Sequence, residues 1–149
     1  MKHWQNIGLE ILLLVLVILY TYTGVAKLVD FGGFRSSMLN QPFPTEWAEV
    51  FALAVPVGEL ALVALLLWPS TRLAGMVGSL ILMTAFTTYV ALIYIGAFPR
   101  VPCGCAGIFD SMSWGAHLVV NLVFVAISAV GIYLSTTMPA VVNQEVGTS

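Results

Sequence analysis

Two cysteines separated by one glycine, Cys103 and Cys105, are the only thiols in this chain of 149 residues. The Cα atoms of such a pair lie about 6.6–7.2 Å apart in an extended chain, whereas a disulfide prefers about 5.5–6 Å, so closure requires a bend. Gly104 permits that bend. A disulfide that closes so small a loop is strained and readily reduced. The spacing therefore favours an exchanging disulfide over a structural one.

Two other interpretations of the cysteine pair stay open. A closed zinc site needs four ligands, and this loop offers two thiols with His117 as a third, so we predict no metal site. The interpretation without chemistry is a pair of inert thiols beside a turn.

Charged side chains inside apolar segments are the next candidates. A carboxylate near the middle of a membrane helix costs about 3 kcal/mol on insertion scales unless it is neutralised or paired, so Glu59 needs a partner. Lys27 is the one basic residue near the same depth, and we predict a Glu59–Lys27 pair. Such a carboxyl group either lies next to a quinone or proton path, or holds two helices together.

The apolar segment after the cysteines begins at Ser113, which can cap a helix. Steps of three and four place several of its residues on one helix face, namely Trp114, His117, Asn121, Phe124 and Ser128. Polar residues on such a face point into the bundle rather than toward lipid. His117 is close enough in depth to the cysteines to stabilise a thiolate, or else it hydrogen-bonds between helices. For Asn121 we favour the interhelical hydrogen bond, and we keep it with Lys27 and Glu59 as a candidate cofactor-binding residue.

Hydroxyl-bearing side chains are frequent in the first and third apolar segments. They are Tyr20, Tyr22, Thr84, Thr87, Thr88, Tyr89 and Tyr94. These side chains would suit a cavity for an isoprenoid quinone, which is the only cofactor that we consider. Packing and interhelical hydrogen bonds are the commoner role, and we favour that role here.

Composition determines the class of protein. The chain is 60% hydrophobic and 8% charged, far from the roughly 45–50% apolar and about 25% charged residues of a soluble domain. We therefore predict a membrane protein in contact with the lipid bilayer. The net charge of -2 without a run of basic residues gives no reason to expect nucleic-acid binding.

Four segments are long enough to cross about 30 Å of hydrocarbon as helices. They are Gly8–Leu28, Trp47–Trp68, Leu73–Phe98 and Trp114–Thr136. The predicted fold is an all-α integral membrane protein, a four-transmembrane-helix up-down-up-down bundle. Residues 1–138 form a single domain in this prediction, and residues 139–149 form a flexible polar tail.

Two long connections lie on the same side of the membrane if the helices alternate. The first, residues 29–46, mixes turn residues with aromatics, and we favour a loop at the membrane interface over a short amphipathic helix. The second, residues 99–113, carries the cysteines. Lysine and arginine counts hardly differ between the sides, but disulfide cycling suits an oxidising compartment. We therefore predict an extracytoplasmic cysteine loop and cytoplasmic termini.

The run Cys-Gly-Cys-Ala-Gly at 103–107, followed by Ser113-Trp114 and Asn121, resembles the methylamine-utilisation protein MauE family, within the wider DoxX-like membrane proteins. Residues 23–28 and 56–60 are similar to the Gly-x-x-Lys and Pro-x-x-Glu features of that group. The resemblance spans all four apolar segments. It implies a four-helix membrane protein associated with redox maturation of exported proteins, here of methylamine dehydrogenase, whose small subunit is rich in disulfides.

The resemblance favours a membrane thiol–disulfide oxidoreductase in which Cys103, Cys105 and His117 act together. Its partner would be a thioredoxin-like or disulfide-containing exported protein, and a membrane quinone would accept electrons. DoxX-like relatives suggest a second interpretation, a quinone-linked subunit for oxidation of sulfur compounds. A non-catalytic assembly or anchor subunit is a third, and a small-molecule transporter is a fourth, with least support.

Overall fold

A computed structural model describes residues 2–99 and 112–137 of the chain. Within these ranges the ordered elements are five α-helices and one 3-10 turn. They are α1 (Lys2–Val29), α2 (Phe31–Leu39), α3 (Thr45–Leu67), η1 (Pro69–Thr71), α4 (Arg72–Tyr94) and α5 (Trp114–Thr137). Four of these helices are long and apolar enough to cross a membrane. The predicted class, an all-α membrane protein with four spanning helices, is confirmed.

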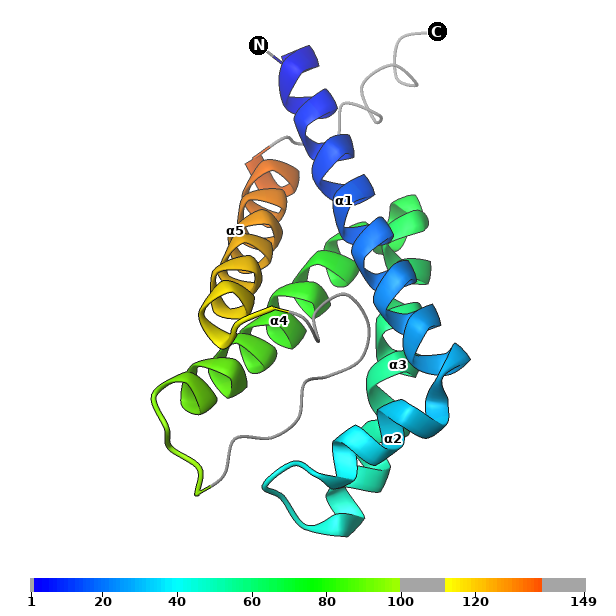
Figure 1. Ribbon diagram of the computed structural model, residues 1–149. Helices are drawn as coiled ribbons and strands as arrows, with labels where there is room; N and C mark the ends of the chain where they lie inside the picture. Colours follow the sequence, from blue (N-terminus) through cyan, green and yellow to red (C-terminus); the bar gives the residue numbers. More distant parts are fainter. Residues whose placement is uncertain (1, 100–111, 138–149) are drawn as a thin grey trace, which may run out of the picture.

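The long helices alternate in direction (Figure 1). In that view α1 and α4 run downwards and α3 and α5 run upwards, consistent with the predicted up-down-up-down order. The helix α2 and the beginning of α5 lie toward the lower end, and the N-terminus lies at the upper end. The connection between α4 and α5, which carries the cysteines, therefore starts and ends at the end of the bundle where α2 lies.

Two helix boundaries differ from the predicted segments by more than two residues. The first helix begins at Lys2 rather than Gly8, because polar residues continue the helix beyond the apolar run. The third spanning helix ends at Tyr94 rather than Phe98. Gly96 has a φ of 73°, and the next residue donates its backbone N–H to the Leu92 carbonyl at 2.9 Å. This glycine-dependent Schellman arrangement ends the helix, although the hydrophobic residues continue.

The first long connection is a helix and not the predicted interfacial loop. The Asp30 carboxylate caps α2 by accepting a backbone N–H at 3.1 Å. Phe34 and Met38, one turn apart, are buried against Ala48 and Ala52 of α3. The two small alanines let α2 lie close to α3, so that its aromatic residues Phe31 and Phe34 pack against the protein.

The main core joins α1, α3 and α4. Its buried residues are Leu13, Leu16, Tyr20, Leu62, Leu66, Met76 and Met83. The helix α3 continues through the buried Pro56. An exposed ion pair joins α2 to α3: Arg35 donates to the Glu49 carboxylate, and these hydrogen bonds raise the pKa of the Arg35 guanidinium.

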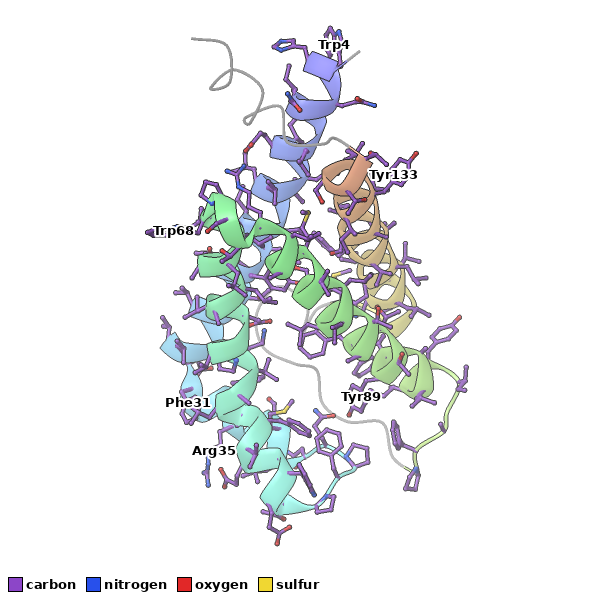
Figure 2. The ribbon with its side chains drawn as sticks, turned by 180° about the vertical axis from the view of Figure 1, so that it is seen from behind. Trp4, Phe31, Arg35, Trp68, Tyr89 and Tyr133 are labelled. Atoms are coloured by element: carbon purple, nitrogen blue, oxygen red, sulfur yellow. The ribbon has the colours of Figure 1, made fainter. Side chains whose placement is uncertain are left out.

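Exposed aromatic side chains gather at both ends of the bundle. Figure 2 shows Trp4, Trp68 and Tyr133 toward the end opposite α2. They are 77%, 70% and 66% exposed. Trp47 at the start of α3 and Tyr94 at the end of α4 are exposed at the other end. Such belts mark the two headgroup regions of a membrane.

Gly75 permits the close approach of α4 to α3. A Cβ atom added there would lie 3.0 Å from the Leu66 side chain and 3.0 Å from its backbone nitrogen. We expect Gly75→Val to destabilise the protein by about 1–3 kcal/mol, because a backbone atom cannot give way. Thermal unfolding in detergent measures this. Gly8→Val is the control, because nothing lies within 4 Å of its added Cβ; an equal loss in both variants would contradict the prediction.

Candidate functional site

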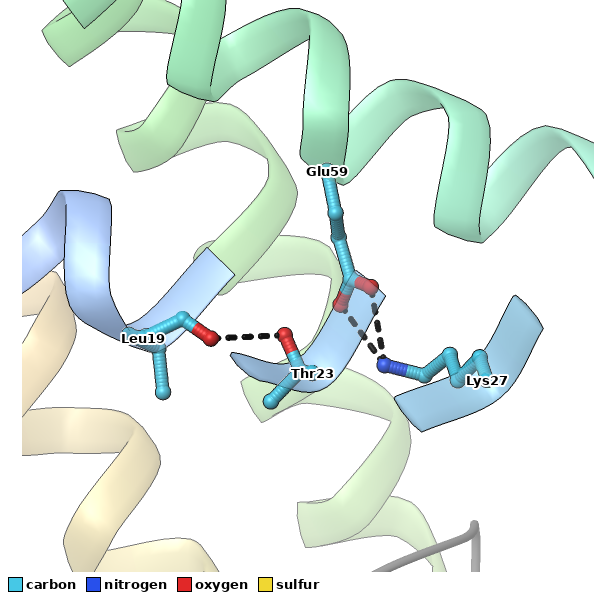
Figure 3. Close-up of polar contacts among 4 residues, drawn as sticks. All are labelled: Leu19, Thr23, Lys27 and Glu59. Atoms are coloured by element: carbon cyan, nitrogen blue, oxygen red, sulfur yellow. Dashed lines mark hydrogen bonds and ion pairs between the residues drawn. The ribbon is translucent and has the colours of Figure 1, made fainter. Parts of the chain in front are cut away.

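A buried ion pair joins α1 to α3. The Lys27 Nζ atom donates to the two carboxylate oxygens of Glu59 at 2.8 and 2.9 Å. Figure 3 shows these two hydrogen bonds. The side chains are only 10% and 3% exposed, so both charges are withdrawn from solvent. The pair that the sequence predicted is therefore confirmed. Breaking such a pair is costly, because the remaining charge stays buried without a partner.

The neighbouring residues explain how the pair fits. A Cβ atom added at Gly24 would lie 3.2 Å from the Leu60 side chain and 3.4 Å from the Glu59 Cβ, so the glycine brings α1 close to α3. The Thr23 hydroxyl donates to the Leu19 carbonyl at 3.0 Å and lies beside the pair (Figure 3).

The short helix α2 covers the ammonium group from one side. The Lys27 Nζ atom lies 5.7 Å from the centroid of the Phe34 ring, a cation–π contact. Phe34 itself is 1% exposed. The helix that replaces the expected loop thus contributes directly to the surroundings of the buried charges.

The ion pair lies in the wall of a cavity of about 500 Å³. This volume falls in the range of roughly 300–1,000 Å³ that small-molecule sites occupy. All five helices line the cavity, mainly through apolar side chains such as Phe34, Leu82, Phe86 and Phe124. Its polar lining comes from a few residues, namely Tyr20, Thr23, Lys27, Glu59, Tyr89, His117 and Asn121. An apolar chamber with a few convergent polar groups is the usual form of a ligand site.

One wall of the cavity is fixed by Tyr89 of α4. Its hydroxyl donates to the amide oxygen of Gln41, a residue of the α2–α3 connection that is 1% exposed. The ring of Phe43, from the same connection, lies 5.6 Å from the Tyr89 ring, and the Phe98 ring lies 5.8 Å from it. Phe98 is close to the beginning of the cysteine connection, so this connection leaves the bundle beside a cavity residue.

The other end of the cysteine connection is fixed by the first turn of α5. The Ser113 hydroxyl accepts the backbone N–H of Ala116 at 3.3 Å, which confirms the predicted cap. The rings of Trp114 and His117 stack with centroids 6.2 Å apart. His117 and Asn121, one turn apart, both line the cavity, as their predicted common face requires.

Asn121 differs from its predicted role as an interhelical hydrogen-bonding residue. Its side chain is buried at 6% exposure, and among the described residues its amide nitrogen has no hydrogen-bond partner. The prediction is wrong at this donor because the facing wall of the cavity is mainly apolar. A buried amide donor without an acceptor costs free energy, so its position in a cavity wall is informative.

The hydroxyl-bearing residues divide into two groups. Tyr20 and Tyr89 line the cavity, whereas Tyr22 and Tyr94 are 43% and 61% exposed on the outside. The Thr87 hydroxyl donates to a carbonyl of its own helix at 2.6 Å and does not line the cavity. The favoured role in packing and interhelical hydrogen bonding is seen at Tyr20, which lies in the main core and whose hydroxyl donates to the Ser79 carbonyl of α4 at 3.5 Å. A quinone in the cavity that Tyr20 and Tyr89 line stays a prediction.

Cys103 and Cys105 lie outside the described residues, as does the predicted tail 139–149. Within residues 2–99 and 112–137, no group of three or more histidine, cysteine, aspartate or glutamate side chains could hold a metal ion.

The contributions of Phe34, Gln41 and Phe43 to the site were not predicted from the sequence. The capping Asp30 and the one-turn spacing of Phe34 and Met38 were the signals that would have indicated α2.

These features define a membrane protein with four spanning helices, whose bundle lines a largely apolar cavity with a buried lysine–glutamate pair in its wall. The family model of the methylamine utilisation protein MauE matches residues 5–134, and the chain belongs to this family. No curated protein and no solved structure matches the chain.

The ion pair predicts a strongly coupled double-mutant cycle. Lys27→Met leaves a buried carboxylate and Glu59→Leu leaves a buried ammonium, so each should lower the free energy of unfolding by about 3–5 kcal/mol. The double variant Lys27→Met/Glu59→Leu should recover most of this loss, since no unpaired charge remains. Unfolding in mixed micelles measures all three variants.

The exposed pair Arg35–Glu49 provides the control, because its side chains are 48% and 39% exposed. Its coupling should be far smaller than that of the buried pair. Additive losses in the Lys27 and Glu59 variants would contradict the prediction.

Proposed function

We propose that this protein exchanges disulfides with exported proteins through Cys103 and Cys105 and so serves their redox maturation. The observation that carries the proposal is the anchoring of the cysteine connection on the cavity. Phe98 before the cysteines contacts Tyr89, and Trp114 after them stacks on His117. Tyr89 and His117 both line the cavity. Membership of the MauE family is consistent with a maturation role in methylamine utilisation.

The proposed chemistry follows ordinary thiol–disulfide exchange. A thiolate of the reduced partner attacks a sulfur of the oxidised partner, which forms a mixed disulfide and releases one thiolate. A second thiol of the reduced partner then resolves the mixed disulfide. Two electrons and two protons move between the partners. The Cys-Gly-Cys spacing supports this role, because a strained bridge is readily exchanged.

His117 is proposed to assist the cysteines. It lies one turn into α5, the helix that directly follows the cysteine connection. An imidazole at this position stabilises a thiolate by charge or by hydrogen bonding.

A membrane quinone is the proposed electron acceptor for the cysteine pair. The cavity supports it by its volume of about 500 Å³, its apolar walls and the unpartnered amide donor of Asn121. Lys27 and Glu59 lie in the same cavity and are proposed to line the bound molecule. A quinone held there would accept two electrons and two protons from the dithiol.

The proposed orientation follows from the chemistry. Disulfides persist in oxidising compartments, so the cysteine connection is proposed to face outside the cytoplasm and both termini to face the cytoplasm. The partner is then a thioredoxin-like or disulfide-containing exported protein.

Trapping of a mixed disulfide tests the proposal. In membranes, Cys103→Ala and Cys105→Ala should each retain a single thiol, and at least one of them should accumulate a covalent adduct with its partner, because the resolving thiol is missing. Electrophoresis with and without reductant detects the adduct, and the double variant is the control.

Alkylation of the native protein with and without prior reduction measures whether the pair is ever oxidised. A pair that is never oxidised, with no adduct in either single variant, would instead favour a non-catalytic anchor subunit.

The proposed role of His117 predicts that its replacement slows alkylation of the cysteines. We expect His117→Phe to lower the alkylation rate of the reduced cysteines several-fold near neutral pH, because the thiolate loses its stabilising neighbour. The rate measured from pH 5 to 9 separates this effect from altered access, which would lower the rate equally at all pH values. His3→Phe is the matched control, because His3 lies near the N-terminus in α1.

A further inference from the structure

Asn121 places an unused hydrogen-bond donor in the cavity wall. Of the buried side-chain atoms without a partner in the described residues, only its amide nitrogen belongs to a residue that lines the cavity. The residue is 6% exposed. A buried donor of this kind is destabilising unless an acceptor is supplied, so the position suits a ligand that brings one.

The charges in the cavity wall restrict what the ligand can be. The Lys27 ammonium donates twice to the Glu59 carboxylate, and its remaining side faces the Phe34 ring. The pair is therefore neutralised within the protein. A charged ligand would lose its hydration on entry and would have to compete for partners that are already engaged, so the cavity favours an uncharged ligand.

The apolar walls determine the rest of the ligand. Side chains from α2, α4 and α5, including Met38, Leu82 and Phe124, surround the same space as Asn121. Such side chains favour the apolar part of a ligand by burying its surface, and this interaction does not orient the ligand. The single amide donor then fixes the orientation of the ligand, as a few placed polar groups do in most small-molecule sites.

We propose that the cavity binds an uncharged, lipid-soluble carbonyl compound, whose carbonyl oxygen accepts a hydrogen bond from the Asn121 amide nitrogen. A membrane quinone and an ester-linked lipid both carry such a carbonyl. The inference deepens the proposed function, on which it rests only for the quinone as electron acceptor. Asn121 is the recognition residue, and the binding itself does not require the cysteines.

Ligand titration of the full chain in dodecyl maltoside tests the site, because this detergent has no carbonyl group. Decylubiquinone and dioctanoylglycerol are titrated separately, and the quenching or change of tryptophan fluorescence and the ligand-induced shift in Tm are measured. Trp114 reports on the site because it stacks on His117, which lines the cavity. Asn121→Leu should weaken binding about tenfold, as expected for the loss of one buried hydrogen bond.

The stability of the ligand-free protein separates recognition from a structural role. Asn121→Leu removes an unpaired buried donor, so the ligand-free Tm should stay the same or rise while the ligand-induced shift is lost. A residue that holds helices together would instead lower the ligand-free Tm. Asn121→Ala is the second variant in case leucine is too large. Ser128→Ala is the control on the same helix, since Ser128 is buried, donates to its own helix and does not line the cavity.

The outcomes are distinct. Binding of decylubiquinone alone identifies a quinone, binding of dioctanoylglycerol alone identifies a lipid, and either result supports the inference if Asn121→Leu weakens it. Absence of binding for both compounds, or equal affinity in wild type and Asn121→Leu, overturns it. The titration is repeated with Cys103→Ser/Cys105→Ser, which should bind normally. A failure of disulfide exchange would then not contradict the ligand site, and a failure of ligand binding would not contradict disulfide exchange.

Discussion

The rest of the structure depends on the hydrogen-bonded ion pair between Lys27 and Glu59. Two opposite charges this deep in an apolar bundle are tolerated only if they meet, so the pair determines how α1 lies against α3. Gly24 provides the close approach that the contact needs. Phe34 of α2 covers the ammonium group, so that even the short helix outside the four spanning segments is adapted to this pair.

The pair also determines the character of the cavity beside it. Because the two charges neutralise each other, the chamber contains charged residues and still suits an uncharged ligand. Asn121 contributes an amide donor from α5, a different helix from those that carry the pair. The cysteine connection begins and ends beside the same chamber, at residues that contact Tyr89 and His117. The proposed redox loop and the proposed ligand would thus meet at one end of the bundle.

Much of this architecture could be predicted from single residues and their depth. The four apolar runs identified the four spanning helices to within a few residues at most of their ends. The partner of Glu59 could be predicted, because burial of a lone carboxylate is costly and Lys27 is the one basic residue near the same depth. The common face of His117 and Asn121 followed from helical periodicity. In each case one strong local property determines the feature that was predicted. This property is apolar burial for the spanning helices, charge for the ion pair and helical periodicity for the shared face.

Other features depended on several weak terms. The first connection contains glycines and aromatics that are as typical of an interfacial loop as of a short helix. The packing of Phe34 against Ala48 stabilises the helix α2. Asn121 looked like an interhelical hydrogen-bonding residue, yet its amide nitrogen is buried without a partner among the described residues, in a residue that lines the cavity. The Asp30 cap and the one-turn spacing of Phe34 and Met38 are local signals for α2, but the unpaired amide nitrogen of Asn121 has no such signal in the neighbouring residues.

The sequence by itself determined the membrane class, the spanning segments and the Lys27–Glu59 pair, because hydrophobic burial and charge act on each segment independently of the others. Only the tertiary structure decided that a cavity exists, that α2 lines it and that the Asn121 amide nitrogen has no partner among the described residues. A cavity is the space that remains after all helices have packed, so it depends on every contact in the bundle and on no single run of residues.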